Sequence, residues 1–145
     1  MNKWQQGFSQ KMGELRTQWT TRLDAVAEAE LDPVFEEFTE FMRPWDFRTS
    51  KRESENAVRT FKFALDEEAY VLLFFRRKGV DGIECQHECV VPGQGRSEGK
   101  VADTGIRSAN REWAESCFQQ ALDQLVAKLT ETERARDVLE PMLVG

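Results

Sequence analysis

The chain has 145 residues, of which 40% are apolar and 32% charged, and these values are typical of one folded domain, residues 1–145. Nine glycines and four prolines are too few for a collagen-like, low-complexity or disordered chain. The net charge of -6 makes nucleic acid an unlikely partner, because an acidic protein does not attract phosphate at long range.

The charge is unevenly distributed along the chain. Residues 1–42 carry a net charge of -4 and residues 81–145 carry -5, whereas residues 43–80 carry +3. The middle third is therefore a local basic island in an acidic protein.

The cysteine count and the apolar runs indicate a cytoplasmic protein. Three cysteines are an odd number in a chain large enough to fold without disulfides, which favours a reducing compartment. Polar residues interrupt the first 19 positions, so no signal peptide is expected. The longest continuous apolar run has seven residues, far fewer than the roughly 20 that span a bilayer, and we expect no membrane partner.

The first 30 residues have a helical pattern. Their apolar side chains recur at steps of three or four and fall on one stripe of a helix: Trp4, Phe8, Met12, Leu15, Trp19, Leu23 and Val26. Gly7 and Gly13 each disfavour the helix by up to about 1 kcal/mol relative to alanine. We therefore expect its first turns to depend on tertiary contacts.

A second, short helix is expected after a break. Asp32 is a favoured N-cap and Pro33 suits the first helical position, so together they predict a stop and a restart. Pro44 disfavours a helical conformation at Arg43 and ends this helix.

From Trp45 the pattern alternates, with the aromatic and β-branched residues typical of strands. The expected strands are residues 45–49, 57–65, 70–77 and 83–91, with a weak fifth near residues 100–106. Their short connections favour an antiparallel meander, because a parallel crossover takes a dozen or more residues. Residues 70–77 are apolar on both faces, which predicts a central strand covered at least partly on both sides.

A long C-terminal helix completes the expected fold. Ser108 or Asn110 can cap it, and a broad apolar face runs from Trp113 to Leu129. Past Pro141 a short apolar tail, residues 142–144, either docks or frays. The predicted class is α+β: a four- to five-stranded antiparallel meander with two N-terminal helices and one long C-terminal helix packed on one face.

One segment groups residues capable of metal or thiol chemistry. Cys85, His87 and Cys89 lie on one side of the expected strand, and Cys117 of the last helix could join them. On a strand the two outer cysteines are about 13 Å apart, too far for one disulfide or one zinc ion. Packing as small apolar side chains is therefore preferred to a metal site or a reactive thiol, and no cofactor is expected.

The basic island supplies a candidate anion or partner patch: Arg59, Lys62, Arg76 and Arg77. If several of these side chains meet on an uncovered sheet face, they would attract an anion. The alternative is that they pair with the acidic helices.

Three classes of function remain. The preferred one is a non-enzymatic interaction module, homo-oligomeric or bound to a protein partner through an apolar helix or sheet face. The alternative is a small-molecule or anion-binding domain with a pocket between sheet and helices. An enzyme that depends on a thiol or a metal is the least favoured class, because no convergent set of catalytic groups is evident.

Overall fold

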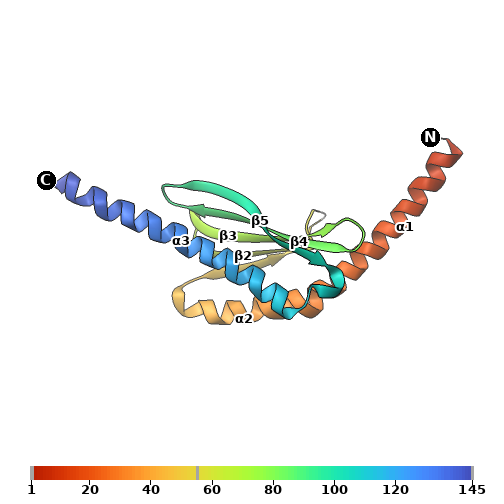
Figure 1. The fold of residues 1–145 in the computed structure, drawn as a ribbon, viewed down its shortest axis with the longest axis horizontal. Helices are drawn as coiled ribbons and strands as arrows, with labels where there is room; N and C mark the ends of the chain where they lie inside the picture. The colour runs from red at the N-terminus through yellow and green to blue at the C-terminus, as the bar shows by residue number, and fades with distance from the viewer. Residues whose placement is uncertain (1, 55, 145) are drawn as a thin grey trace.

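The computed structural model describes residues 2–54 and 56–144, with side chains as far as residue 138. Five strands form one antiparallel sheet in the order β1 to β5: β1 (Arg48–Arg52), β2 (Arg59–Asp66), β3 (Ala69–Lys78), β4 (Gly82–Val91) and β5 (Gly95–Gly105). The main helices are α1 (Lys3–Val26), α2 (Asp32–Met42) and α3 (Arg111–Val144). Helices α2 and α3 lie against one face of the sheet (Figure 1), so the expected α+β meander with helices on one face is confirmed.

The N-terminal helix begins at a capping box. The Asn2 side chain accepts a hydrogen bond from the Gln5 backbone N–H (2.8 Å), and the Gln5 side chain accepts one from the Asn2 N–H (3.0 Å). The expected break at Asp32 is wrong, because a π-helical turn, η1 (Ala27–Leu31), joins α1 to α2 without a loop. This wider turn just precedes Pro33, which has no N–H to donate to a regular helix.

The strands agree with the sequence in the middle of the sheet and differ at its edges. Strands β2, β3 and β4 begin and end within two residues of the expected positions. The first strand begins at Arg48 instead of Trp45, because η2 (Arg43–Trp45) is a 3-10 turn that ends at Asp46 in a left-handed conformation (φ 66°). The fifth strand is a full edge strand, longer than the weak one expected.

The core lies between the sheet and helices α2 and α3. Phe118 of α3 is fully buried at its centre, and its ring centroid is 5.2 to 6.5 Å from those of five other rings: Phe35, Phe38, Phe61, Phe63 and Phe75. Helix α3 starts where expected, since the Asn110 side chain accepts a hydrogen bond from the Trp113 N–H (3.0 Å).

One charged side chain is buried beside this core. Arg59 donates to both carboxylate oxygens of Asp32, at 2.9 and 3.0 Å, and to the carbonyl of Val58 at 2.8 Å. Asp24 and Glu53 lie 3.2 Å away at the solvent side. The hydrogen bonds to Asp32 raise the pKa of Arg59. This ion pair ties the start of α2 to the first residue of β2.

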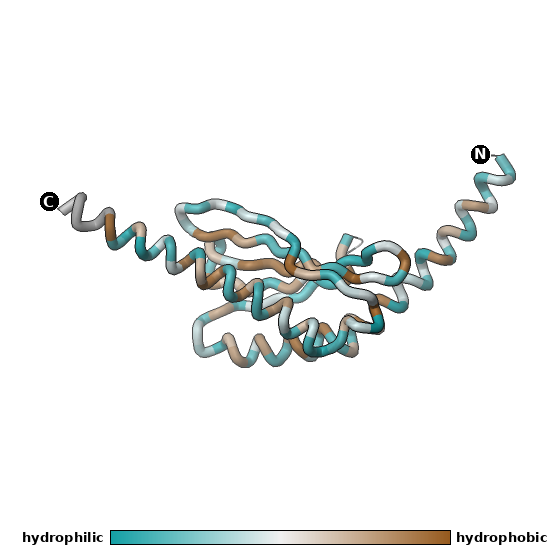
Figure 2. Tube along the Cα trace, in the orientation of Figure 1, coloured by the Kyte–Doolittle hydropathy of each residue, from teal (hydrophilic) through white to brown (hydrophobic). Residues whose placement is uncertain are grey.

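Both ends of the chain extend beyond the sheet as helices, at opposite ends of the molecule (Figure 1). We call residues 3–18 of α1 the arm. The predicted apolar stripe of α1 is buried at Leu23, but in the arm Trp4, Phe8 and Leu15 are 71%, 52% and 39% exposed. Figure 2 shows apolar positions (brown) recurring along this arm. Its apolar side chains therefore have little of the sheet or the other helices beneath them.

The last helix also extends past the sheet. Its buried positions end at Leu125, and Val126, expected on the apolar face, is 54% exposed. The predicted apolar tail, residues 142–144, lies outside the described side chains. In the part of the chain that the structure describes, no helix combines the length and apolarity needed to cross a membrane.

Candidate functional site on the open face of the sheet

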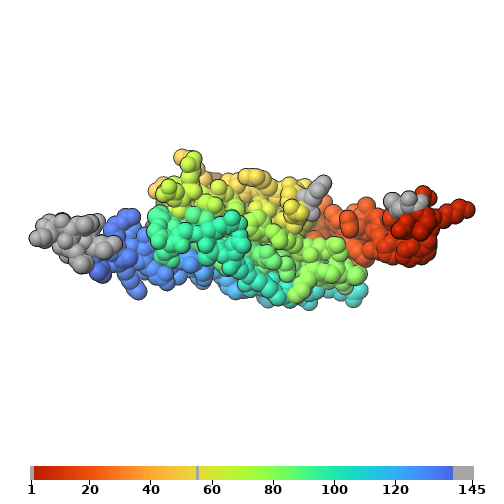
Figure 3. Space-filling view, turned by 90° about the horizontal axis from the view of Figure 1, so that it is seen from above, coloured from red at the N-terminus to blue at the C-terminus, as the bar shows by residue number. Residues whose placement is uncertain are grey.

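The sheet has a face that no described helix covers, here called the open face. Alternate residues of all five strands reach it, and the register aligns Ser50, Lys62, Leu72, Glu88 and Glu98 across it. Figure 3 looks onto the molecule from this side, with the strands between the two helical ends.

The central strand β3 presents apolar side chains on this face as well as in the core. Tyr70, Leu72 and Phe74 are half-buried there. Their cover is basic: the Lys62 Nζ lies 4.5 Å from the Tyr70 ring centroid, and the Arg76 guanidinium carbon lies 5.4 Å from that of Phe74. The partial cover predicted for both sides of this strand comes, on the open face, from cationic side chains in place of a second layer of helices.

The half of the open face formed by β1, β2 and β3 is cationic. It carries four basic side chains: Arg48, Arg52, Lys62 and Arg76. Among residues 2–54 and 56–138, no carboxylate lies at ion-pairing distance from any of the four. Their charge is therefore available to an external anion.

The half formed by β4 and β5 is different, because its cations are paired. Arg96 forms ion pairs with Glu88 and Glu98. Asp103 binds both Lys100 and Lys78, the latter at 2.8 Å, and these hydrogen bonds lower the pKa of Asp103 to about 2. The open face thus has one half with free positive charge and one half that is internally neutralised.

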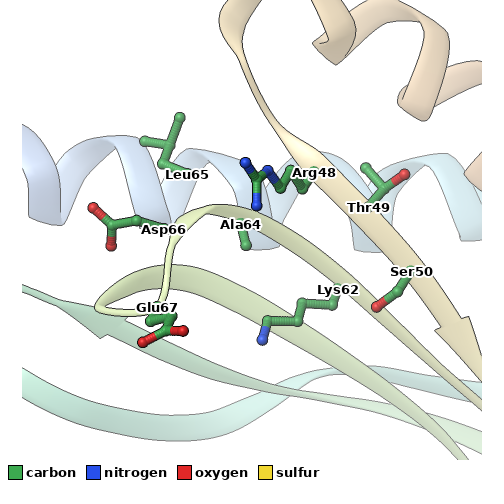
Figure 4. A pocket seen from close by; sticks show the side chains of 8 residues that line it. All are labelled: Arg48, Thr49, Ser50, Lys62, Ala64, Leu65, Asp66 and Glu67. Carbon is green, nitrogen blue, oxygen red and sulfur yellow. The ribbon is translucent and has the colours of Figure 1, made fainter.

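Two adjoining grooves lie on the cationic half. The larger, with a volume of about 390 Å³, is shown in Figure 4 and lies between β1 and the end of β2: Arg48, Thr49, Ser50, Lys62, Ala64, Leu65, Asp66 and Glu67. The smaller, of about 250 Å³, shares Ser50 and Lys62 with it and continues along β1 and β2 onto β3: Ser50, Arg52, Ser54, Thr60, Lys62, Leu72 and Phe74.

The structure does not bring all four residues of the predicted anion patch together. Lys62 and Arg76 lie on the open face, but Arg59 is buried on the helix-facing side, where carboxylates already occupy its guanidinium. Arg77 lies over the Trp19 ring of α1, at 4.9 Å. Arg59 therefore does not belong to an accessible patch.

Arg76 and Arg77 do meet at one end of the sheet. Together with Arg16 of α1 they line a separate hollow of about 340 Å³. Since Arg77 packs on Trp19 and donates to the Gly79 carbonyl, only part of this charge faces the hollow.

Two residues of the cationic half, Arg48 and Arg52, were in the basic island but were not singled out from it. The signal that could have found them is their spacing with Ser50, because residues two apart share one face of a strand. The first strand was expected at residues 45–49, which excluded Arg52.

The predicted thiol and histidine cluster lies within the core side of β4. Cys85, His87 and Cys89 all face the helices, opposite Phe75, Leu73 and Val71 of β3, and Cys117 of α3 is a neighbour of Cys85. The three cysteines are buried and free. Across the described residues, no three His, Cys, Asp or Glu side chains are grouped closely enough to hold a metal ion.

Burial also sets the protonation of these thiols. Loss of solvent raises the pKa of both Cys85 and Cys89, and for Cys85 the neighbouring Cys117 adds to the effect. The reactive thiolate is therefore disfavoured at neutral pH.

We expect the three thiols to react with an aromatic disulfide reagent only when the protein unfolds. In native buffer the labelling rate should be at least a hundredfold below that of the unfolded chain, and it should rise with urea in parallel with global unfolding. The measurement is absorbance of the released thiolate. Rapid labelling of one cysteine in native buffer would contradict the burial argument.

Comparisons with protein-family models, characterised proteins and solved structures find no match to this chain.

Proposed function

We propose that this protein is a non-catalytic interaction module that associates with further copies of itself through the arm of α1. The observation that carries the proposal is the exposure of Trp4, Phe8 and Leu15 on the same stripe that is buried at Leu23. Exposed apolar side chains in one continuous row are typical of a docking surface, whereas scattered ones are ordinary.

The spacing of the stripe supports a helical docking element. Trp4, Leu15 and Val26 are eleven residues apart, as are Phe8 and Trp19. An eleven-residue period of 3.67 per turn keeps one face of a nearly straight helix apolar along its whole length. The arm, residues 3–18, therefore presents about 24 Å of helix with a continuous apolar side.

The charge of the arm favours an acidic receptor. It carries Lys3, Lys11 and Arg16 against the single acid Glu14, and none of these three basic side chains forms an ion pair with a described residue. Residues 24–40, by contrast, contain seven acidic and no basic side chains, and three of these acids, Glu28, Glu30 and Glu36, form no ion pair with a described residue. Two arms would repel each other, whereas an arm and the acidic end of another copy would attract.

A matching surface lies at the end of α2 that is farther from the arm (Figure 1). Phe41 and Trp45, where α2 ends, are 70% and 65% exposed, and we call this pair the α2 patch. The surrounding residues 36–46 carry four acidic and one basic side chain; Glu40 pairs with Arg43 and Glu37 with Arg111, which leaves Glu36 and Asp46 without an ion pair among the described residues. The α2 patch thus offers apolar side chains within negative charge, the complement of the arm. A head-to-tail contact between copies follows from this arrangement.

Burial raises the pKa of Cys85 and of Cys89 and so disfavours their nucleophilic thiolate form, which supports a binding role over a catalytic one. The three cysteines form no disulfide among the described residues, which is compatible with a reducing compartment. We therefore propose that the module is cytoplasmic.

Light scattering during gel filtration tests the proposal. The measured mass of the wild-type protein should exceed the monomer mass of 16.8 kDa and should increase with protein concentration. One double variant, Trp4→Ser with Phe8→Ser, removes the two most exposed apolar side chains of the arm. The other, Phe41→Ser with Trp45→Ser, removes the apolar side chains of the α2 patch. Each variant should remain monomeric. Gln10→Ser, on the polar side of the arm, is the matched control and should assemble like wild type.

Mixing the two defective variants gives the sharpest result. One retains a working α2 patch and the other a working arm, so the mixture should form a dimer with one copy of each. Wild-type protein that stays monomeric at every concentration overturns the proposal. Assembly of the α2 patch variant by itself overturns the head-to-tail arrangement.

A further inference from the structure

We propose that the smaller groove on the open face, here called the β1–β2 groove, binds a phosphate monoester that carries a small apolar or aromatic group. The groove is lined by Ser50, Arg52, Ser54, Thr60, Lys62, Leu72 and Phe74. This site is separate from the arm and the α2 patch, and it goes beyond the proposed self-association.

The cations of the groove come from neighbouring strands. Arg52 of β1 is paired with Thr60 of β2 in the register, and Lys62 of β2 is paired with Ser50 of β1. Each of these two residue pairs therefore contributes one cation and one hydroxyl to the same side of the sheet. Neither Arg52 nor Lys62 has an ion-pair partner among the described residues. The Lys62 Nζ lies 4.5 Å from the Tyr70 ring centroid, and by turning from that ring into the groove it would join Arg52 in giving charge-assisted hydrogen bonds to a dianionic group.

The hydroxyls complete a polar wall. The Ser54 hydroxyl is oriented by Ala57, whose N–H donates to it at 3.2 Å. The side-chain hydroxyls of Ser50 and Thr60 have no hydrogen-bond partner among the described residues, so they can donate to phosphate oxygens. The Ser54 hydroxyl donates to the Ala57 carbonyl at 3.5 Å, so the donors left for a ligand are the two cations and the hydroxyls of Ser50 and Thr60, which suit the three terminal oxygens of a phosphate monoester.

The floor of the groove is apolar and argues for a ligand larger than phosphate itself. Leu72 and Phe74 of the central strand form it, and the Arg76 guanidinium carbon, outside the lining, lies 5.4 Å from the Phe74 ring centroid. A volume of about 250 Å³ lies just below the roughly 300–1,000 Å³ of most small-molecule sites, so the groove suits a ligand no larger than a phosphate with one ring. An adjoining groove of about 390 Å³, with which it shares Ser50 and Lys62, leaves room for a longer substituent.

The experiment is an NMR titration of the full chain, labelled with nitrogen-15, with three probes. Phenyl phosphate contains both the anion and the ring, inorganic phosphate contains only the anion, and benzyl alcohol contains only the ring. Phenyl phosphate should shift the amide signals of β1 and β2, with an affinity about tenfold above that of inorganic phosphate. Benzyl alcohol should cause no comparable shift.

Variants locate the site. Arg52→Gln and Lys62→Gln should each weaken phenyl phosphate binding about tenfold. Arg107→Gln removes the same charge from an exposed residue of η3 (Ile106–Ser108) and should leave the affinity unchanged. Thermal unfolding confirms that each variant is folded.

Three outcomes would overturn the proposal: no binding of phenyl phosphate, equal weakening by Arg107→Gln, or equal binding of benzyl alcohol. No binding, or equal weakening by Arg107→Gln, would show that the groove is not a site for the anion. Equal binding of benzyl alcohol would show that the cations of the groove contribute nothing to the affinity. None of these results changes the light-scattering test of self-association, so the two proposals fail independently.

Discussion

Replacing Asp32 by alanine is expected to lower the free energy of unfolding by about 3–5 kcal/mol. The Arg59 side chain is only 3% exposed and donates two hydrogen bonds to the Asp32 carboxylate, at 2.9 and 3.0 Å. Without Asp32 the guanidinium keeps its charge in a site that water hardly reaches. The remaining partners, Asp24 and Glu53, are mostly solvated and compensate little. Urea unfolding followed by tryptophan fluorescence measures the change.

Two further variants identify the origin of this loss. Asp24→Ala removes a carboxylate that also contacts Arg59 but is 49% exposed, and it should cost no more than about 1 kcal/mol. Arg59→Met combined with Asp32→Leu removes the whole pair and should approach wild-type stability. Equal losses for Asp24→Ala and Asp32→Ala would contradict the distinction between the buried and the exposed partner.

Replacing Phe118 by alanine is expected to lower the free energy of unfolding by about 3–5 kcal/mol. The ring is fully buried and lies among five other phenylalanine rings contributed by α2, β2 and β3. Its removal leaves a cavity. Neither the sheet nor the helices can move in to fill it, because the backbone hydrogen bonds within each element keep its shape. The same urea titration gives the result.

The matched controls are on the same helix and at the same site. Phe118→Leu keeps much of the volume and should cost less than Phe118→Ala. Val126→Ala changes a side chain that is 54% exposed, and its effect should stay within about 0.5 kcal/mol. A loss at Val126 as large as that at Phe118 would show that α3 is not packed as described.

Elements whose burial follows a regular period could be predicted from the sequence. Strand β2 alternates between buried and half-buried residues from Arg59 to Ala64, and this alternation is visible in the amino-acid order itself, whereas β3 was predicted from a run of residues that is apolar on both faces. The start of α3 was equally readable, because Asn110 caps a helix through a contact only three residues long.

Contacts between distant residues could not be predicted in the same way. Arg59 and Asp32 are 27 positions apart on different elements, so the sequence shows a basic residue in a basic island without its partner. The break expected at Asp32 failed for the same reason, since the carboxylate that would cap a helix binds Arg59 instead.

The candidate surfaces could not be predicted from the sequence, because their exposure depends on which other elements pack against them. The period of the stripe in α1 predicts one apolar face but not that the sheet ends before Leu15 is reached. In β1, the strand ends at Arg52, three residues later than expected, and this later end places Arg52 on the open face together with Arg48. Such shifts follow from local turns like the left-handed Asp46, which the sequence alone signals weakly.

The π-helical turn between α1 and α2 has a consequence for the thermodynamics of recognition. Because the backbone stays helical from Lys3 to Met42, the arm has a fixed direction relative to the sheet and is not joined to it by a flexible loop. A receptor that engages it has little backbone motion to freeze, so less of the contact energy is offset by lost chain entropy. The rod-like junction thus pre-orients the arm before any encounter takes place.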